Sequence, residues 1–328
     1  MNKPLIVTGA HGFLGRHVAR RAAEAGYNVY GVGHGAWLRE EWELWGLSSW
    51  HRDDVTLETL RGLSIEPLAI VHCAGSGSVA FSLANPIQDL QRTVFTTAEV
   101  LEFIRKHSPS TKLIYPSSAG VYGAVEEVPI REEAVPAPIS PYGAHKLMAE
   151  QIIGSYARSF GVNSAVIRFF SIFGTGLRKQ FLWDACRKLS QRDFTFAGTG
   201  HEVRDWLYVE DASSLAITAL DHASAGCPVV NGGTGRGTKV AELLGQLAEH
   251  LGFSEMKPEF TNVTRAGDPA RYIAETSKAI AWGWSPEKDL SSRVAEYVDW
   301  WLSEMGFAKA RAAATNSATM TDRPRSDS

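Results

Sequence analysis

The chain is poor in cysteine and has no long apolar run. Its three cysteines, Cys73, Cys186 and Cys227, lie far apart in 328 residues and form no cluster with histidine, so we expect no bound metal. No apolar stretch is long enough to span a bilayer, and the first one is too short for a signal peptide. These absences predict a cytoplasmic protein with no membrane partner.

The chain also lacks a large excess of positive or negative charge. The sequence has 33 Lys and Arg against 36 Asp and Glu, a net charge of −3, and the basic residues form no run. We therefore expect no nucleic acid partner. Residues 308–328 are small and polar without hydrophobic periodicity, which predicts a disordered tail.

What the sequence does contain is an alternation of short apolar runs with amphipathic segments. "PLIVTG" is typical of a buried strand, "FLGRHVARRAAEAG" of a helix ended by glycine, and "NVYGVG" of a second strand. Continued alternation predicts parallel strands joined by right-handed crossovers. We expect an α/β fold with a Rossmann-type doubly wound parallel sheet over residues 1–175, to which some later segments return. A smaller C-terminal α/β substrate-binding lobe should occupy residues 176–307.

The segment "TGAHGFLG" follows the first strand and opens the first helix. Gly9 permits a tight turn, Gly12 lets the backbone approach a pyrophosphate, and Gly15 lets the helix pack close to the sheet. Phosphates would then meet the unpaired N–H groups at the helix start, around Phe13 and Leu14. The pattern predicts a dinucleotide site.

The second strand ends in "GVGHG", where such sites usually carry an acidic residue for the adenosine ribose. Gly33 and His34 stand there instead, so no carboxylate repels a 2′-phosphate and NADP is allowed. Arg16, His34 or Arg39 could contact that phosphate, or all three could be ordinary surface side chains. The expected cofactor is NAD or NADP, with NAD slightly favoured.

Two aspartates follow the third predicted strand in "HRDDV". Asp54 could accept a hydrogen bond from the adenine amino group. Alternatively, Asp53 or Asp54 could cap the next helix.

Four polar side chains are expected at the carboxyl edge of the sheet, where open sheets bind ligands. "YPSSAGVYG" ends a strand, which brings Ser117 and Ser118 to this edge, and "YGAHK" places Tyr142 and Lys146 one turn apart on the next helix. An ammonium group and a positively charged nicotinamide would favour the phenolate of Tyr142. The set suits hydride transfer to and from a secondary alcohol, although an ordinary exposed helix start would also explain the spacing.

These motifs occur together with "HCAG", "RFFSIFG", "RDWLYVED" and "RAGDPARYIAETSKA". In this order and spacing the chain resembles the extended short-chain dehydrogenase/reductase family over about residues 4–302. It is most similar to the NAD-dependent sugar-nucleotide epimerases and dehydratases of the UDP-galactose 4-epimerase type.

The resemblance implies a role for each matching residue. Ser118 matches the catalytic hydroxyl, Tyr142 the acid/base and Lys146 the residue that holds the nicotinamide ribose. The implied cofactor contacts are Gly9, Gly12, Phe13, Leu14, Gly15, Gly33, His34, Asp54, Val55, Cys73, Ala74, Gly75, Thr93, Ser117, Tyr142, Lys146 and Phe169. The implied substrate contacts are Ser78, Ser118, Ser171, Gln180, Arg204 and Arg265, of which the two arginines match residues that clamp a diphosphate.

The chain departs from the family pattern at several positions. Ser171 and Thr93 stand where the family usually has asparagine. Ala119 and Gly120 stand where the dehydratases carry Asp-Glu, so the acid/base pair for water elimination is missing.

We therefore predict an epimerase of a nucleotide-diphosphate sugar that works by transient oxidation to a keto-sugar, with Tyr142 as acid/base. Gly33 motivates an alternative, an NADP-dependent reductase of a keto-sugar nucleotide. A non-catalytic dinucleotide sensor is a third hypothesis, against which the complete Ser/Tyr/Lys set argues. The resemblance also implies a homodimer, formed through the helices that begin near Ile87 and Tyr142.

Overall fold

A computed structural model of the chain describes residues 3–263 and 270–321. Its centre is a seven-stranded parallel sheet in the order β11-β6-β5-β4-β1-β2-β3. The strands are β1 (Pro4–Thr8), β2 (Asn28–Gly33), β3 (Leu47–Arg52), β4 (Ala69–His72), β5 (Lys112–Ser118), β6 (Ser164–Phe169) and β11 (Val229–Gly232). The strand order reverses between β1 and β4, which confirms the predicted doubly wound sheet.

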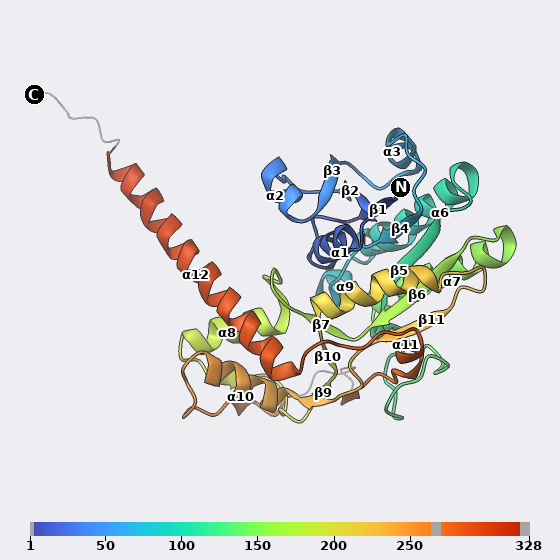
Figure 1. Cartoon of the computed structure of the whole chain (residues 1–328). Coiled ribbons are helices and arrows are strands. Elements are labelled where there is room, and N and C mark those ends of the chain that lie inside the picture. Colours follow the sequence, from blue (N-terminus) through green and yellow to red (C-terminus); the bar gives the residue numbers. More distant parts are fainter. Residues whose placement is uncertain (1–2, 264–269, 322–328) are drawn as a thin grey trace, which may run out of the picture.

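Helices cover both faces of this sheet (Figure 1). One face packs against α1 (Phe13–Glu24), α9 (Val209–Thr218) and α11 (Ser277–Ala281), and the other against α3 (Leu57–Gly62), α6 (Thr96–His107) and α7 (Pro141–Phe160). Alternate strand residues serve the two cores, since Leu5 and Val7 join the first and Ile6 the second. All three are fully buried, as expected for strands covered on both sides.

A second, smaller group of elements forms its own core. Apolar side chains of α8 (Gln180–Ser190), α10 (Val240–His250) and α12 (Leu290–Thr321) meet there, among them Leu182, Leu244 and Trp301. Short strands accompany them: β7 (Ser171–Phe173) with β10 (Trp206–Tyr208), β8 (Thr195–Phe196) with β13 (Glu259–Phe260), and β9 (Val203–Arg204) between β12 (Thr238–Lys239) and β14 (Arg271–Tyr272). Between these elements the chain returns to the large sheet through α9 and β11.

The remaining helical segments are short: α2 (Arg39–Leu44), α4 (Val79–Ala84), α5 (Pro86–Leu90), the π-helix η1 (Gln91–Phe95), and the 3₁₀ turns η2 (Ala119–Val121) and η3 (Ala219–Asp221). Within the described ranges, no helix has the length and apolar character needed to cross a bilayer.

Helix α12 continues to Thr321 and projects away from the body (Figure 1), into the segment from residue 308 for which the sequence predicts a disordered tail. Alanine, the strongest helix former, is frequent in this segment, and no glycine or proline interrupts it between Gly306 and Thr321. A helix of this composition can form without apolar periodicity. The absence of that periodicity was the reason for predicting a disordered tail.

Candidate active site

The glycine turn that connects β1 to α1 packs closely against neighbouring backbone. Gly9 has a φ of +66°, and a Cβ at this position would lie 2.7 Å from the Ala74 nitrogen. A Cβ at Gly15 would lie 2.2 Å from the Gly9 carbonyl oxygen. Gly12 precedes α1, whose first turn has neither a side-chain cap nor an acidic residue. An uncapped helix start above a turn that excludes side chains fits the pyrophosphate of a dinucleotide.

The ends of β2 and β3 form the neighbouring surface. The exposed His34 and Asp54 form an ion pair with 2.8 Å between Nε2 and Oδ1. Helix α3 is capped by Thr56, whose hydroxyl accepts from the Thr59 N–H at 3.1 Å. Capping by Asp53 or Asp54, one of the two alternatives from the sequence, is therefore wrong.

The three candidates for contact with a 2′-phosphate each have another partner. His34 is paired with Asp54, and Arg39 with Glu43 at 2.7 Å. Arg16 donates to the His11 carbonyl oxygen at 2.6 Å and lies over the rings of two tryptophans, Trp37 and Trp45.

Ser118 and Tyr142 meet where β5 ends and α7 begins. The Ser118 hydroxyl accepts from the Gly120 N–H at 3.1 Å. Burial raises the pKa of Tyr142, and a hydrogen bond with Ser118 offsets part of that rise. A Cβ at Gly120 would lie 3.3 Å from Ser118 Oγ and 3.6 Å from Tyr142 Cε1, so this glycine keeps the approach open. Helix α7 has Ser140 as its cap and a proline in its first turn.

Lys146 is the buried member of the set, with 7% of its surface exposed. Its ammonium donates to the Pro116 carbonyl oxygen at 2.9 Å and lies 4.7 Å from the centre of the Tyr115 ring. Burial lowers its pKa to about 8, against the opposing influence of Cys73, Glu150 and Asp89. The geometry thus places a phenol, a hydroxyl and a buried amine at one edge of the sheet.

Ser117 has a different partner on α7. Its hydroxyl donates to Glu150 at 2.5 Å, and Glu150 forms a buried ion pair with Arg168 at 2.7 Å. Ser117 was predicted to contact the cofactor, but its hydroxyl is engaged in holding β5 to α7.

The other predicted cofactor contacts lie on neighbouring segments. Cys73, Ala74 and Gly75 follow β4, and Thr93 lies behind them on η1, with its hydroxyl 3.6 Å from where a Gly75 Cβ would be. The remaining two, Val55 and Phe169, are largely buried in the protein core.

The model of the NAD dependent epimerase/dehydratase family matches residues 5–233. The chain belongs to this family. The putative UDP-glucose 4-epimerase of Methanocaldococcus jannaschii is 29% identical over 310 residues, which cover 90% of this chain and 97% of that protein. The GDP-6-deoxy-D-mannose reductase of Pseudomonas aeruginosa is 28% identical over 325 residues, 93% of this chain and 99% of that protein. The crystal structure of a UDP-glucose 4-epimerase with UDP-glucose from Thermotoga maritima superimposes with a TM-score of 0.83 at 27% identity, covering 92% of this chain and 99% of that one.

The predicted substrate residues of this epimerase/dehydratase family member divide into two groups. Ser78 caps α4, and beside it the Gln180 side chain donates to the Gly77 carbonyl oxygen at 3.0 Å. Ser171 begins β7, and its N–H donates to the carbonyl oxygen of Asp205, the residue after Arg204, at 3.0 Å. Arg265 lies outside the described residues.

Asp205, which the sequence did not single out, organises the second group. It is fully buried, and its carboxylate accepts from the N–H groups of Thr234, Gly235 and Ala274 at 2.7, 2.9 and 3.1 Å. These bonds join the loop after β11 to the end of β14 and fix the backbone next to Arg204.

Sequence reasoning also missed residues that hold the start of α7. The Ser82 hydroxyl accepts from the Tyr142 N–H at 3.0 Å, and His145 pairs with the buried Asp89. Of these residues, only His145 lies inside a motif that the sequence analysis singled out, "YGAHK".

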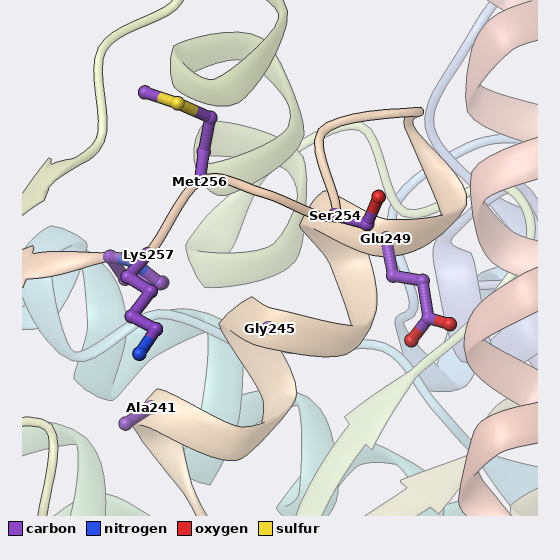
Figure 2. Close-up of a pocket in the computed structure, with 7 residues that line it drawn as sticks. Ala241, Gly245, Glu249, Ser254, Met256 and Lys257 are labelled. Atoms are coloured by element: carbon purple, nitrogen blue, oxygen red, sulfur yellow. The ribbon is translucent and has the colours of Figure 1, made fainter.

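A cavity of about 600 Å³ lies elsewhere, against α10 (Figure 2). Its lining includes Glu249 and Lys257 but none of the predicted residues. In the described ranges, no three His, Cys, Asp or Glu side chains are placed to hold a metal ion.

Proposed function

We propose that this protein is an NAD-dependent epimerase of a nucleotide-diphosphate sugar. The observation that carries the proposal is the meeting of Ser118 and Tyr142 beside the buried Lys146, at the sheet edge that also carries the glycine turn. Family membership supports the same conclusion.

Each member of the set has one task. The Ser118 hydroxyl holds the sugar oxygen, Tyr142 takes the proton of that hydroxyl, and Lys146 holds the nicotinamide ribose. Bound NAD supplies a two-electron acceptor that gives the electrons back. The keto-sugar turns in the site, and Tyr142 returns the proton to the same oxygen. No net proton or electron is consumed.

NAD is proposed rather than NADP. The 2′-phosphate would need a cation, and Arg16, His34 and Arg39 are held by other groups. Asp54 adds a negative charge beside His34, which disfavours a further anion. Isothermal titration with both cofactors tests this, and tighter binding of NADP would contradict it.

The substrate is proposed to lie between the large sheet and the C-terminal elements. Arg204 would contact the diphosphate, held by the backbone that Asp205 fixes. Gln180 and Ser78 lie close together across the two parts, where the sugar would enter.

The alternative is a one-way reductase of a keto-sugar nucleotide. The similarity to a GDP-6-deoxy-D-mannose reductase at 28% identity favours it. Such an enzyme consumes one reduced cofactor for each product, which the epimerase does not.

Proton NMR on UDP-, GDP-, CDP- and dTDP-sugars, incubated with protein and NAD without reductant, separates the two. A new isomer with unchanged total sugar is the expected result. No conversion in any tube, together with stoichiometric NADPH consumption on a keto-sugar, would establish the reductase instead.

We also propose a homodimer through α5, η1 and α7. Ile87, Phe95 and Met148 are 65%, 57% and 44% exposed on these elements, although they are apolar. Grouped exposed apolar side chains are typical of an interface, and a second copy is the partner that the family resemblance implies.

A further inference from the structure

A buried hydrogen-bonded pair ties α5 to the start of α7. Asp89 is fully buried, His145 is 8% exposed, and 2.5 Å separates Oδ2 from Nδ1. His145 lies between Tyr142 and Lys146 in the sequence, within the first two turns of α7. The pair therefore fixes the part of α7 that carries both residues to a separate helix.

The second oxygen of Asp89 has no partner within the described structure. A buried carboxylate is costly unless its oxygens are satisfied or its charge is matched. Oδ1 of Asp89 accepts no hydrogen bond, and, next to the larger effect of burial, its charge raises the pKa of Lys146, Tyr142 and Tyr115. The charge of Asp89 thus acts on the site itself.

The other groups around Lys146 are accounted for. Glu150, on α7, is matched by the two-pronged contact with Arg168, and the Cys73 thiol keeps its proton because burial raises its pKa to about 12. His72, on β4, is held neutral by burial, which lowers its pKa to about 3. Among the described groups around Lys146, Asp89 is the carboxylate that has no arginine partner.

We propose that Asp89 is a positioning residue of the proposed reaction: through its buried hydrogen bond with His145 it holds the first turns of α7, and with them Tyr142 and Lys146. This inference rests on the proposed function. Asp89 itself touches neither sugar nor cofactor in this role.

The test follows NAD binding by tryptophan fluorescence from pH 6 to 10 in the wild type and in Asp89→Asn. Wild-type affinity should fall as pH rises through about 8, where Lys146 loses its proton. Without the charge of Asp89 the pKa of Lys146 drops further, so the midpoint should move to lower pH. The alkaline limb of kcat should move in the same direction, with KM for the sugar little changed.

Asp211→Asn is the matched control. Asp211 is also a buried carboxylate, 2% exposed, but it lies on α9 and accepts from the Glu287 N–H at 3.0 Å. Both variants should lower Tm, and only Asp89→Asn should move the midpoint. Equal midpoints in all three proteins would mean that Asp89 is merely structural and would overturn the proposal.

If Asp89→Asn does not fold, variants of His145 test the proposal instead. His145→Ala should lower kcat at least about tenfold, and His145→Gln, which can still donate to Asp89, should restore most of it. Wild-type kcat in His145→Ala would contradict the proposal. If the wild type binds NAD but converts no nucleotide sugar, the proposed function fails, and the pH midpoint of NAD binding still decides the role of Asp89.

Discussion

At the scale of single residues, adjacent serines have separate roles. Ser118 meets Tyr142, whereas Ser117 donates to Glu150, two turns further along α7. Successive side chains of a strand point to opposite faces, so only one of the two can reach the site. The proposed chemistry therefore depends on Tyr142 and Ser118, with Lys146 behind them.

Tyr142→Phe removes the proposed acid/base and should leave the fold intact. We expect kcat to fall at least about 100-fold, because the sugar hydroxyl loses its proton acceptor, while NAD affinity stays close to wild type. Tyr156→Phe is the control on the same helix, since the Tyr156 hydroxyl donates to Glu102 at 2.8 Å, on α6 rather than in the site. A Tyr142→Phe enzyme with wild-type kcat would exclude Tyr142 as the acid/base.

Lys146 predicts opposite pH trends for activity and stability. Its pKa in the folded protein is about 8, against the usual 10.5, so between these values the unfolded chain binds more protons. The contribution of Lys146 to unfolding free energy therefore rises with pH in this window, while kcat falls. Urea titrations of the wild type and Lys146→Met across pH 7–10 measure this difference. A contribution that falls with pH would contradict the buried ammonium.

At the scale of elements, the glycine turn makes the sharpest prediction. In Gly15→Ala the new Cβ meets the Gly9 carbonyl oxygen, which is backbone and cannot move aside. We expect a loss of about 1–3 kcal/mol in unfolding free energy and a clear loss of NAD affinity, by denaturation and calorimetry.

Gly245→Ala is the matched control for that substitution. Gly245 lies inside α10 (Figure 2). Among the described residues, nothing outside the helix's own backbone lies within 4 Å of the place that a Cβ would take. Alanine there should stabilise the protein by about 0.5–1 kcal/mol. Equal losses in both variants would show that close packing at Gly15 is not the cause.

The sequence predicted these elements unevenly, for physical reasons. The strands of the large sheet are short apolar runs, its helices carry a period-3.6 pattern, and the glycines mark the turn, so all three could be predicted. The pairing of Asp89 with His145 joins residues 56 positions apart, and no local pattern announces it. The Thr56 cap was missed because aspartates stand directly before it.

At the scale of the whole molecule, the exposed apolar side chains of α5, η1 and α7 predict self-association. Ile87→Asp places a charge in the proposed interface and should convert the proposed dimer to monomers in sedimentation experiments. The folded monomer should change little because Ile87 is 65% exposed. A wild-type protein that sediments as a monomer would contradict the interface.

In the proposed reaction, the proton and the hydride taken from the sugar return to it within one site, between the large sheet and the C-terminal elements. Nothing leaves the site except the isomerised sugar, so the hydrogen removed from the sugar carbon must return to it. This requirement distinguishes the epimerase from every reductase.

The most direct test uses a nucleotide sugar labelled with deuterium at the epimerised carbon, incubated with the protein and NAD in ordinary water. We predict that the new isomer keeps the deuterium at that carbon, as seen by NMR and mass spectrometry, with no added reductant. Loss of the label to solvent, or product formed only when reduced cofactor is supplied, would contradict transient oxidation with internal return.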